Sequence, residues 1–249
     1  MKEISTKTGG TALKCLKTVL ICLVILWALS GCGREPVQTL APATAPAIQP
    51  DPQPAGERTV VYKDAARYFL MPVEKHSWPR EHPPQCVLLH FTSAVVLDRD
   101  DPYNMDLIRQ NFLNYDLSIH SIVDRDGTVY CYIPENRSAW HAGPGIWQGH
   151  PEQTDKLNHY SIGIEIVAIG SQKDMEPYFT GAEYRKIDPT LIGYTDAQYD
   201  ALQKLVADIC TRYDIPMTRE YVLGHQDYSS AKTDPGELFD WSRILPTEE

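Results

Sequence analysis

Basic residues are scarce in this sequence of 249 residues. Lysine and arginine together number 23 against 33 aspartates and glutamates, which gives a formal net charge of −10. Proteins that bind nucleic acid neutralise phosphates with clustered basic side chains, so this balance excludes nucleic acid as a partner. The acidic residues are spread along the chain and indicate a solvated surface. Since 43% of the residues are hydrophobic, a wholly disordered chain is also excluded.

Long hydrophobic runs are also absent. The longest run, residues 19–29, has 11 residues, whereas a helix that spans a bilayer needs about 20. A transmembrane anchor is therefore not predicted. Four lysines precede the run, at positions 2, 7, 14 and 17, which is typical of a signal peptide.

The run ends in Leu29-Ser30-Gly31-Cys32, which resembles the lipobox of bacterial lipoproteins. We predict that residues 1–31 are a lipoprotein signal peptide and that Cys32 carries a lipid such as palmitate. The alternative is an ordinary signal peptide with an incidental cysteine. Without residues 1–31 the chain loses four lysines and one glutamate and carries −13, so the lipid would have to hold it on the membrane. Gly33 after the cysteine indicates an outer-membrane protein of the bacterial cell envelope that faces the periplasm.

Cysteine is too scarce for a disulfide framework. Of the six cysteines, Cys15 and Cys22 lie in the predicted signal peptide and Cys32 is the predicted lipidation site. The three that remain cannot all pair, and each lies in an apolar stretch: Cys86, Cys131 and Cys210. No Cys-x-x-Cys motif is present, so neither a zinc knuckle nor a redox motif is predicted. We expect buried free thiols.

Two further regions follow the signal peptide. Residues 32–58 contain six prolines among Ala, Thr and Gln and lack the bulky apolar residues of a core, which predicts an extended tether of about 3.1 Å per residue. Residues 59–249 alternate strand and helix signals and are predicted to form a globular domain.

Strand and helix signals alternate through this domain. Apolar runs at 86–91 and 161–167 predict strands, the second apolar on one face, and Asp126-Gly127 predicts a hairpin turn between strands at 119–124 and 128–133. Helices are predicted over 102–114 and 196–213, the second because Thr195 and Gln198 form a capping box before an apolar pattern of helical spacing. Residues 171–194 read as a polar loop with aromatics. We predict an α/β domain with a mixed, partly antiparallel central sheet flanked by helices.

Polar side chains lie where such a fold places its strand ends and adjoining loops. Two histidines and a carboxylate at an open site form a known hydrolytic zinc arrangement. Spacing alone leaves six candidates for these ligands: His90, His120, His141, His225, Asp227 and Asp234. Glu165 interrupts an apolar strand, so it requires either a partner or a catalytic role.

Seven strings are similar, in order and spacing, to one enzyme family. They are VLLHFTSA, SIHSIVDRDGTVY, RSAWHAG, NHYSIGIEIVA, GYTDAQYDAL, GHQDYSSAKTDPG and FDW, over about residues 85–245. They resemble the zinc-dependent N-acetylmuramoyl-L-alanine amidases of the amidase type 2 family, in the anhydro-muramoyl branch. Peptidoglycan recognition proteins share the domain more distantly.

The resemblance implies one Zn²⁺ per chain and a role for each matched residue. His90, His225 and Asp234 become the zinc ligands. Glu165 becomes the general base and Lys232 the group that stabilises the oxyanion. Four residues are expected to contact or orient the substrate, with support of the site from behind as the alternative: His120, Trp140, His141 and Asn158.

The implied function is hydrolysis of the amide bond between N-acetylmuramic acid and L-alanine in peptidoglycan or muropeptides. The alternatives are a non-catalytic, membrane-anchored module that binds muropeptides and a zinc amidase that acts on another amide. A binding module typically lacks a zinc ligand, whereas this sequence retains all three matched ligands and Glu165.

Overall fold

A computed structural model describes residues 66–68 and 71–245 of the chain. The predicted signal peptide (1–31) and the predicted tether (32–58) with Cys32 lie outside the described residues. Within the described part, no helix is long and apolar enough to cross a membrane. The three cysteines of this part are free thiols, as expected: Cys86, Cys131 and Cys210.

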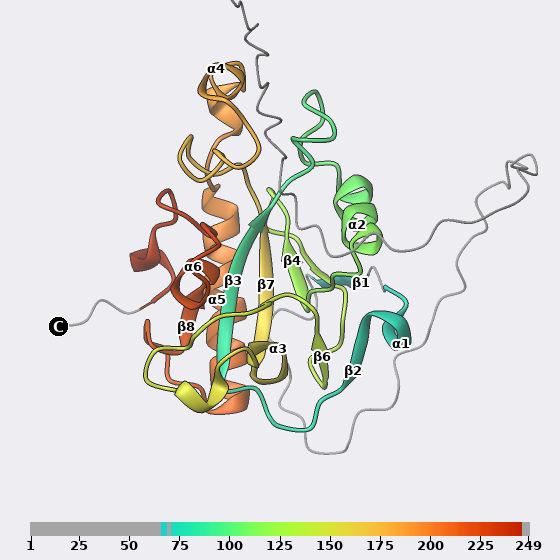
Figure 1. Ribbon diagram of the computed structural model, residues 1–249, viewed down its shortest axis with the longest axis vertical. Helices are drawn as coiled ribbons and strands as arrows, with labels where there is room; N and C mark the ends of the chain where they lie inside the picture. The colour runs from blue at the N-terminus through green and yellow to red at the C-terminus, as the bar shows by residue number, and fades with distance from the viewer. Residues whose placement is uncertain (1–65, 69–70, 246–249) are drawn as a thin grey trace, which may run out of the picture. The chain divides into compact units, whose positions relative to one another are not determined.

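The described residues form eight strands, six helices and three short 3₁₀ turns (Figure 1). The strands are β1 (Ala66–Tyr68), β2 (Ser77–Pro79), β3 (Cys86–Thr92), β4 (Ser121–Val123), β5 (Val129–Cys131), β6 (Arg137–Ala139), β7 (Ser161–Val167) and β8 (Val222–Gly224). The helices are α1 (Val73–His76), α2 (Met105–Asn114), α3 (Leu157–Tyr160), α4 (Gly181–Tyr184), α5 (Asp196–Tyr213) and α6 (His225–Tyr228). The 3₁₀ turns are η1 (Pro151–Gln153), η2 (Pro189–Leu191) and η3 (Trp241–Arg243).

Six strands form one mixed sheet in the order β1-β5-β4-β7-β3-β8. Only β4 and β5 pair antiparallel, across the turn that contains Gly127 at φ +80°, and the other neighbours are parallel. Strands β2 and β6 form a separate antiparallel pair. The predicted mixed, partly antiparallel α/β fold is confirmed.

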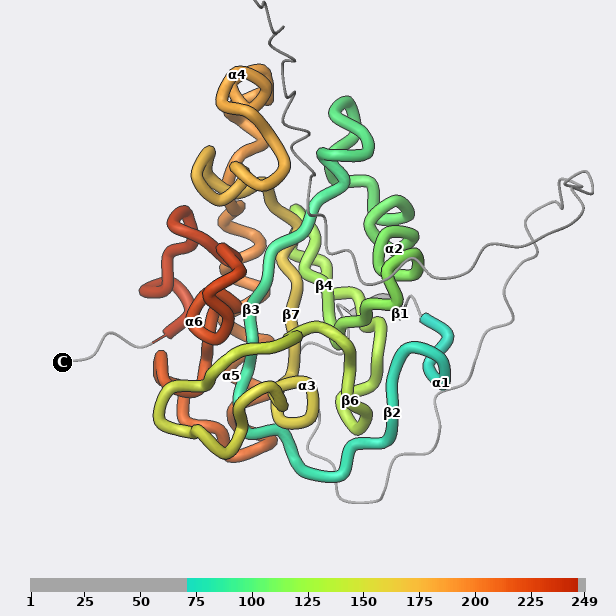
Figure 2. The backbone as a smooth tube through the Cα atoms, viewed as in Figure 1, coloured from blue at the N-terminus to red at the C-terminus, as the bar shows by residue number. Residues whose placement is uncertain are grey.

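Both faces of the central strands β3 and β7 are covered. On one face Val87 and Leu89 join a core with the apolar side of α5, and α5 lies behind the two strands in Figure 1. On the other face Leu88 packs with Trp147 and Leu157, from the segment that crosses in front of the sheet in Figure 2. All seven residues of β7 are therefore buried. The isoleucines of β7 face the α5 core, so the strand is apolar on one face, as predicted.

Residues 171–194 are more ordered than the predicted polar loop. They contain α4 and η2, and four of their apolar side chains pack against Val95 and Ile169: Met175, Phe179, Tyr184 and Ile187. A capping box of Thr180 and Glu183 starts α4. This Thr-x-x-Glu pattern is visible in the sequence and could have predicted the helix.

Helix α5 covers the predicted range and begins with the predicted capping box. The Thr195 hydroxyl accepts from the Gln198 N–H at 3.1 Å, and the Gln198 side chain accepts from the Thr195 N–H at 3.0 Å. The helix ends at Asp214, which adopts a left-handed conformation with φ 56°. Local sequence signals therefore define both ends of the helix that supports the sheet.

The cap of α5 gives a test of stability. Thr195→Ala removes the acceptor for the Gln198 N–H, so we expect the free energy of unfolding in urea to fall by about 1 kcal/mol. Thr211→Ala is the matched control, because Thr211 is an exposed residue inside the same helix and its loss should change stability by less than about 0.5 kcal/mol. Equal losses in the two variants would contradict the assigned cap.

Candidate metal centre

Two candidate residues lie side by side because β3 and β7 pair in parallel. In this pairing His90 stands opposite Glu165. Side chains alternate along a strand, and Leu89 and Ile164 face the α5 core, so His90 and Glu165 point to the opposite face of the sheet. The strand register alone thus places an imidazole beside a carboxylate.

The neighbouring strand delivers two more candidates. Strand β8 pairs parallel with β3 and ends at Gly224, so His225 follows directly at the first residue of α6. Asp234 lies in the next turn, where its carbonyl accepts from the Gln226 N–H at 2.9 Å. Asp227 is directed elsewhere, since its carboxylate accepts from the Gly224 N–H at 2.7 Å and pairs with Arg219.

Residues 171–194 hold the turn that carries Asp234. The Tyr194 hydroxyl donates to the Pro235 carbonyl at 2.5 Å. Gly236 has φ +82° and lies against Asp174, so that a Cβ at position 236 would stand 2.4 Å from a carboxylate oxygen. Glycine is therefore required at this position. Residues 171–194 pack against the turn and support it.

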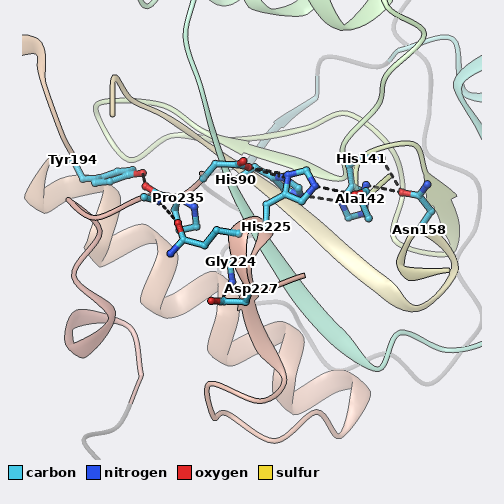
Figure 3. A network of polar contacts seen from close by, with 12 residues as sticks. His90, His141, Ala142, Asn158, Tyr194, Gly224, His225, Asp227 and Pro235 are labelled. Atoms are coloured by element: carbon cyan, nitrogen blue, oxygen red, sulfur yellow. Dashed lines mark hydrogen bonds and ion pairs between the residues drawn. The ribbon is translucent and has the colours of Figure 1, made fainter. Parts of the chain in front are cut away.

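Three potential metal ligands converge at this point (Figure 3). His90 Nδ1 and His225 Nδ1 are 2.9 Å apart, and each is 3.0 Å from Asp234 Oδ2. Among the described residues these three form the group whose ligand atoms could hold one metal ion. The separations are close to the roughly 3.3 Å that a tetrahedral ion with bonds of about 2.0 Å requires between ligand atoms.

The outer nitrogen of His225 shows which atom is free to bind a metal. His225 Nε2 lies 2.8 Å from the carbonyl oxygen of Ala142. A carbonyl only accepts, so Nε2 carries the proton and a neutral His225 presents a bare Nδ1 to the carboxylate. Two acceptors at 3.0 Å without a proton between them repel each other. The arrangement therefore fits a bound cation.

Burial determines the charge states of the site. Burial, and then the neighbouring His225, lower the pKa of His90 to about 4, so the imidazole is neutral near pH 7 and can ligate. Asp234 is a carboxylate that a cation at this point would keep ionised.

Glu165 is a buried carboxylate with an oxygen that lacks a hydrogen-bond partner in the described structure. It is 8% exposed, and its Oε2 has no hydrogen-bond partner among the described residues. Burial raises its pKa well above the ordinary value, Asp234 raises it further, and the charge of Lys232 opposes both. A cation held by the three ligands would also favour the ionised form. Glu165 can therefore act as a proton acceptor beside the candidate metal centre.

The family profile of the N-acetylmuramoyl-L-alanine amidases matches residues 80–237. This chain belongs to that amidase family. It is 36% identical over 129 residues to the 1,6-anhydro-N-acetylmuramyl-L-alanine amidase AmpD of Enterobacter cloacae, and the aligned region covers 51% of this chain and 55% of AmpD. It is 28% identical over 198 residues to the N-acetylmuramoyl-L-alanine amidase AmiD of Escherichia coli K12, and that aligned region covers 76% of this chain and 61% of AmiD. The matches thus span little more than half of these relatives.

Solved structures agree with the family assignment. The crystal structure of a selenomethionine derivative of AmpD superimposes with a TM-score of 0.50 and 26% identity. The superposition covers 72% of this chain and 92% of that chain. The amidase fold therefore accounts for the sheet that carries the candidate metal centre.

Two of the other predicted site residues are exposed. Lys232 lies in the turn before Asp234, and its charge acts on Glu165. Trp140 is 47% exposed, and its ring lies against that of Trp78, with centroids 4.2 Å apart and the ring planes tilted by 46°. Their roles toward an oxyanion and a substrate remain predictions.

His120 lies behind the site, which agrees with the alternative of support from behind. The side chain is 1% exposed. Its Nδ1 accepts from the Gly163 N–H at 2.9 Å, and its Nε2 donates to the Arg137 carbonyl at 3.0 Å. Burial, and then the charge of Arg80, lower the pKa of His120 to about 3. This neutral, fully bonded ring supports β7 and has no surface for a substrate.

His141 and Asn158 also bond within the chain. His141 Nδ1 lies 3.0 Å from His90 Nε2, and Asn158 Oδ1 accepts from the His141 N–H at 2.9 Å. Sequence reasoning missed this connection, and it also missed the backing by Tyr194 and Asp174, because each contact joins residues far apart in the chain.

The raised pKa of Glu165 gives a pH-dependent test. A group whose pKa is higher in the folded state stabilises at low pH, and this stabilisation is lost as the pH rises through the folded-state pKa. Glu165→Gln cannot ionise. In the metal-free protein we therefore expect Glu165→Gln to gain stability relative to the parent as the pH rises. The difference in the free energy of unfolding, variant minus parent, should be more positive at about pH 8 than at about pH 5. Glu176→Gln is the exposed control. An advantage that does not grow with pH would contradict the burial effect.

Proposed function

We propose that the chain hydrolyses the amide bond between N-acetylmuramic acid and L-alanine in peptidoglycan or muropeptides, with one zinc ion per chain. The observation that carries this proposal is the convergence of His90, His225 and Asp234 on one point beside Glu165. The relatives AmpD and AmiD support the choice of this bond, since both are named as amidases of N-acetylmuramyl-L-alanine.

The ligand set supports zinc. Two imidazoles and one carboxylate leave a fourth position open, which is typical of hydrolytic zinc sites. When bound there, zinc would polarise the amide carbonyl and make water more acidic. A binding module without activity is less well supported, because the ligands and the unpartnered Glu165 are all in place.

The chain's own groups account for proton transfer and charge stabilisation. Glu165 Oε2 has no partner in the described structure and is free to take the proton of the attacking water, then pass it to the departing alanine nitrogen. Lys232 contributes positive charge at the same face, where negative charge develops on the carbonyl oxygen. Trp140 offers an exposed aromatic face to the substrate.

The decisive experiment digests purified sacculi and defined muropeptides with the zinc-loaded chain and identifies products by mass spectrometry. Release of free stem peptide with an intact lactyl group on the sugar is expected. Cleavage of any other amide would redirect the proposal to another zinc amidase activity.

Two variants separate the ligand from the base. We expect His90→Ala to lose zinc and hydrolysis together, because two ligands remain. We expect Glu165→Ala to keep zinc by metal analysis but to lose about 10²–10⁴-fold in rate. His82→Ala is a control at an exposed histidine. If Glu165→Ala loses its zinc, then Glu165 is a ligand or a support and not the base.

We propose further that Cys32 is lipidated and anchors the chain in the outer membrane, facing the periplasm. The support is the sequence alone: four lysines, an 11-residue apolar run and Leu29-Ser30-Gly31-Cys32. Because the mature chain would be strongly acidic, we expect Cys32→Ser to move the protein from the membrane fraction to the soluble fraction. Fractionation with immunoblotting measures this, and retention of Cys32→Ser after signal cleavage would contradict the anchor.

A further inference from the structure

The Nε2 atoms of both histidine ligands contact two adjacent residues of one segment. His90 Nε2 lies 3.0 Å from His141 Nδ1, and His225 Nε2 lies 2.8 Å from the carbonyl oxygen of Ala142. Figure 3 shows dashed contacts from the His90 and His225 rings toward His141 and Ala142. One dipeptide thus contacts both imidazoles on the side away from the candidate metal.

The direction of the protons can be followed from a backbone carbonyl. The Ser161 hydroxyl donates to the Leu157 carbonyl at 2.5 Å, because a carbonyl only accepts. The same oxygen lies 3.2 Å from His141 Nε2, so it must accept the Nε2 proton. A neutral His141 therefore has a bare Nδ1, which accepts from His90 Nε2. His90 is left with a bare Nδ1 that faces Asp234 and His225.

The dipeptide itself is fixed from two sides. The His141 N–H and the Ala142 N–H both donate to Asn158 Oδ1, at 2.9 and 2.7 Å. The His141 ring lies directly against β7 at Gly163, where a Cβ would stand 2.6 Å from the ring. Only glycine admits the ring at this distance.

We propose that His141, Ala142, Asn158 and Ser161 form a ligand template that sets the tautomer and orientation of both histidine ligands before a metal binds. His141, Asn158 and Ser161 are then positioning residues, so His141 and Asn158 support the site from behind and do not contact the substrate. The inference rests on the proposed zinc centre. It differs from a substrate role in its consequence, because a template acts on zinc affinity and a substrate contact acts on KM.

A matched pair of variants tests the acceptor at position 141. Leucine and asparagine have nearly the same shape, but only asparagine places an acceptor oxygen where His141 Nδ1 stands. We expect His141→Leu to weaken zinc binding by about 10–100-fold and His141→Asn to recover most of that loss. Zinc alone is the probe, in competition with a chelator of known affinity. The KM of the zinc-saturated variants should stay within about two-fold of the parent.

A second pair tests the anchor at position 158. Asn158→Asp retains oxygens that can accept from both backbone N–H groups, whereas Asn158→Leu does not. We expect zinc affinity close to the parent for aspartate and a loss of about 10-fold or more for leucine. His82→Leu is the control, because His82 is exposed and stacks on Tyr160 away from the ligands. Circular dichroism of each zinc-free variant reports whether it is folded.

Ser161→Ala keeps the test decisive if His141→Leu does not fold. It removes only one oxygen and leaves His141 Nε2 without an acceptor, so zinc affinity should fall while KM stays unchanged. Parental zinc affinity in folded His141→Leu or Ser161→Ala, or a raised KM with unchanged affinity, would overturn the template. Equal weakness of His141→Leu and His141→Asn would also overturn it. A parent chain that binds no zinc would overturn the proposed function and the template together.

Discussion

The parallel pairing of β3 with β7 is the constraint on which the site depends. Cys86–Thr92 and Ser161–Val167 pair over their whole length, so every side chain of one strand has a defined neighbour on the other. Because side chains alternate, the apolar set on one face binds α5 while the other face remains for chemistry. His90 and Glu165 are neighbours for this reason, without any loop to position them.

The site face carries an energetic cost that the opposite face offsets. A bare nitrogen of His225 and a carboxylate oxygen of Asp234 lie 3.0 Å apart, and the buried Glu165 lacks a partner at Oε2 in the described structure. Buried polar groups without partners destabilise a fold. Burial of the isoleucines of β7 and the leucines of α5 on the other face stabilises it. A cation between the ligands would relieve the repulsion, so metal binding and stability are linked in this chain.

Local signals in the sequence predicted the helices and strands, but they could not predict contacts between residues far apart in the chain. The Thr195 capping box and the charge of Glu165 between two isoleucines can each be recognised within a few residues. The structure confirms the helix and the strand that these patterns predict. Spacing alone could not choose among six ligand candidates, because the choice depends on the register of β3, β7 and β8. Nor could the sequence decide between a substrate contact and support from behind for His141, since its partner His90 is 51 positions away.

Strand β7 shows why the polar and small residues of this family motif occur at every second position. Ser161, Gly163 and Glu165 share the site face, and each acts on a different part of the site. Ser161 accepts from His141, Gly163 leaves room for that ring, and Glu165 lies beside His90. A slip of one residue in the pairing would replace this set with isoleucines and turn the polar set into the α5 core. The apolar face of β7 therefore secures the register that the chemistry requires, so the core and the metal centre are specified by the same seven residues.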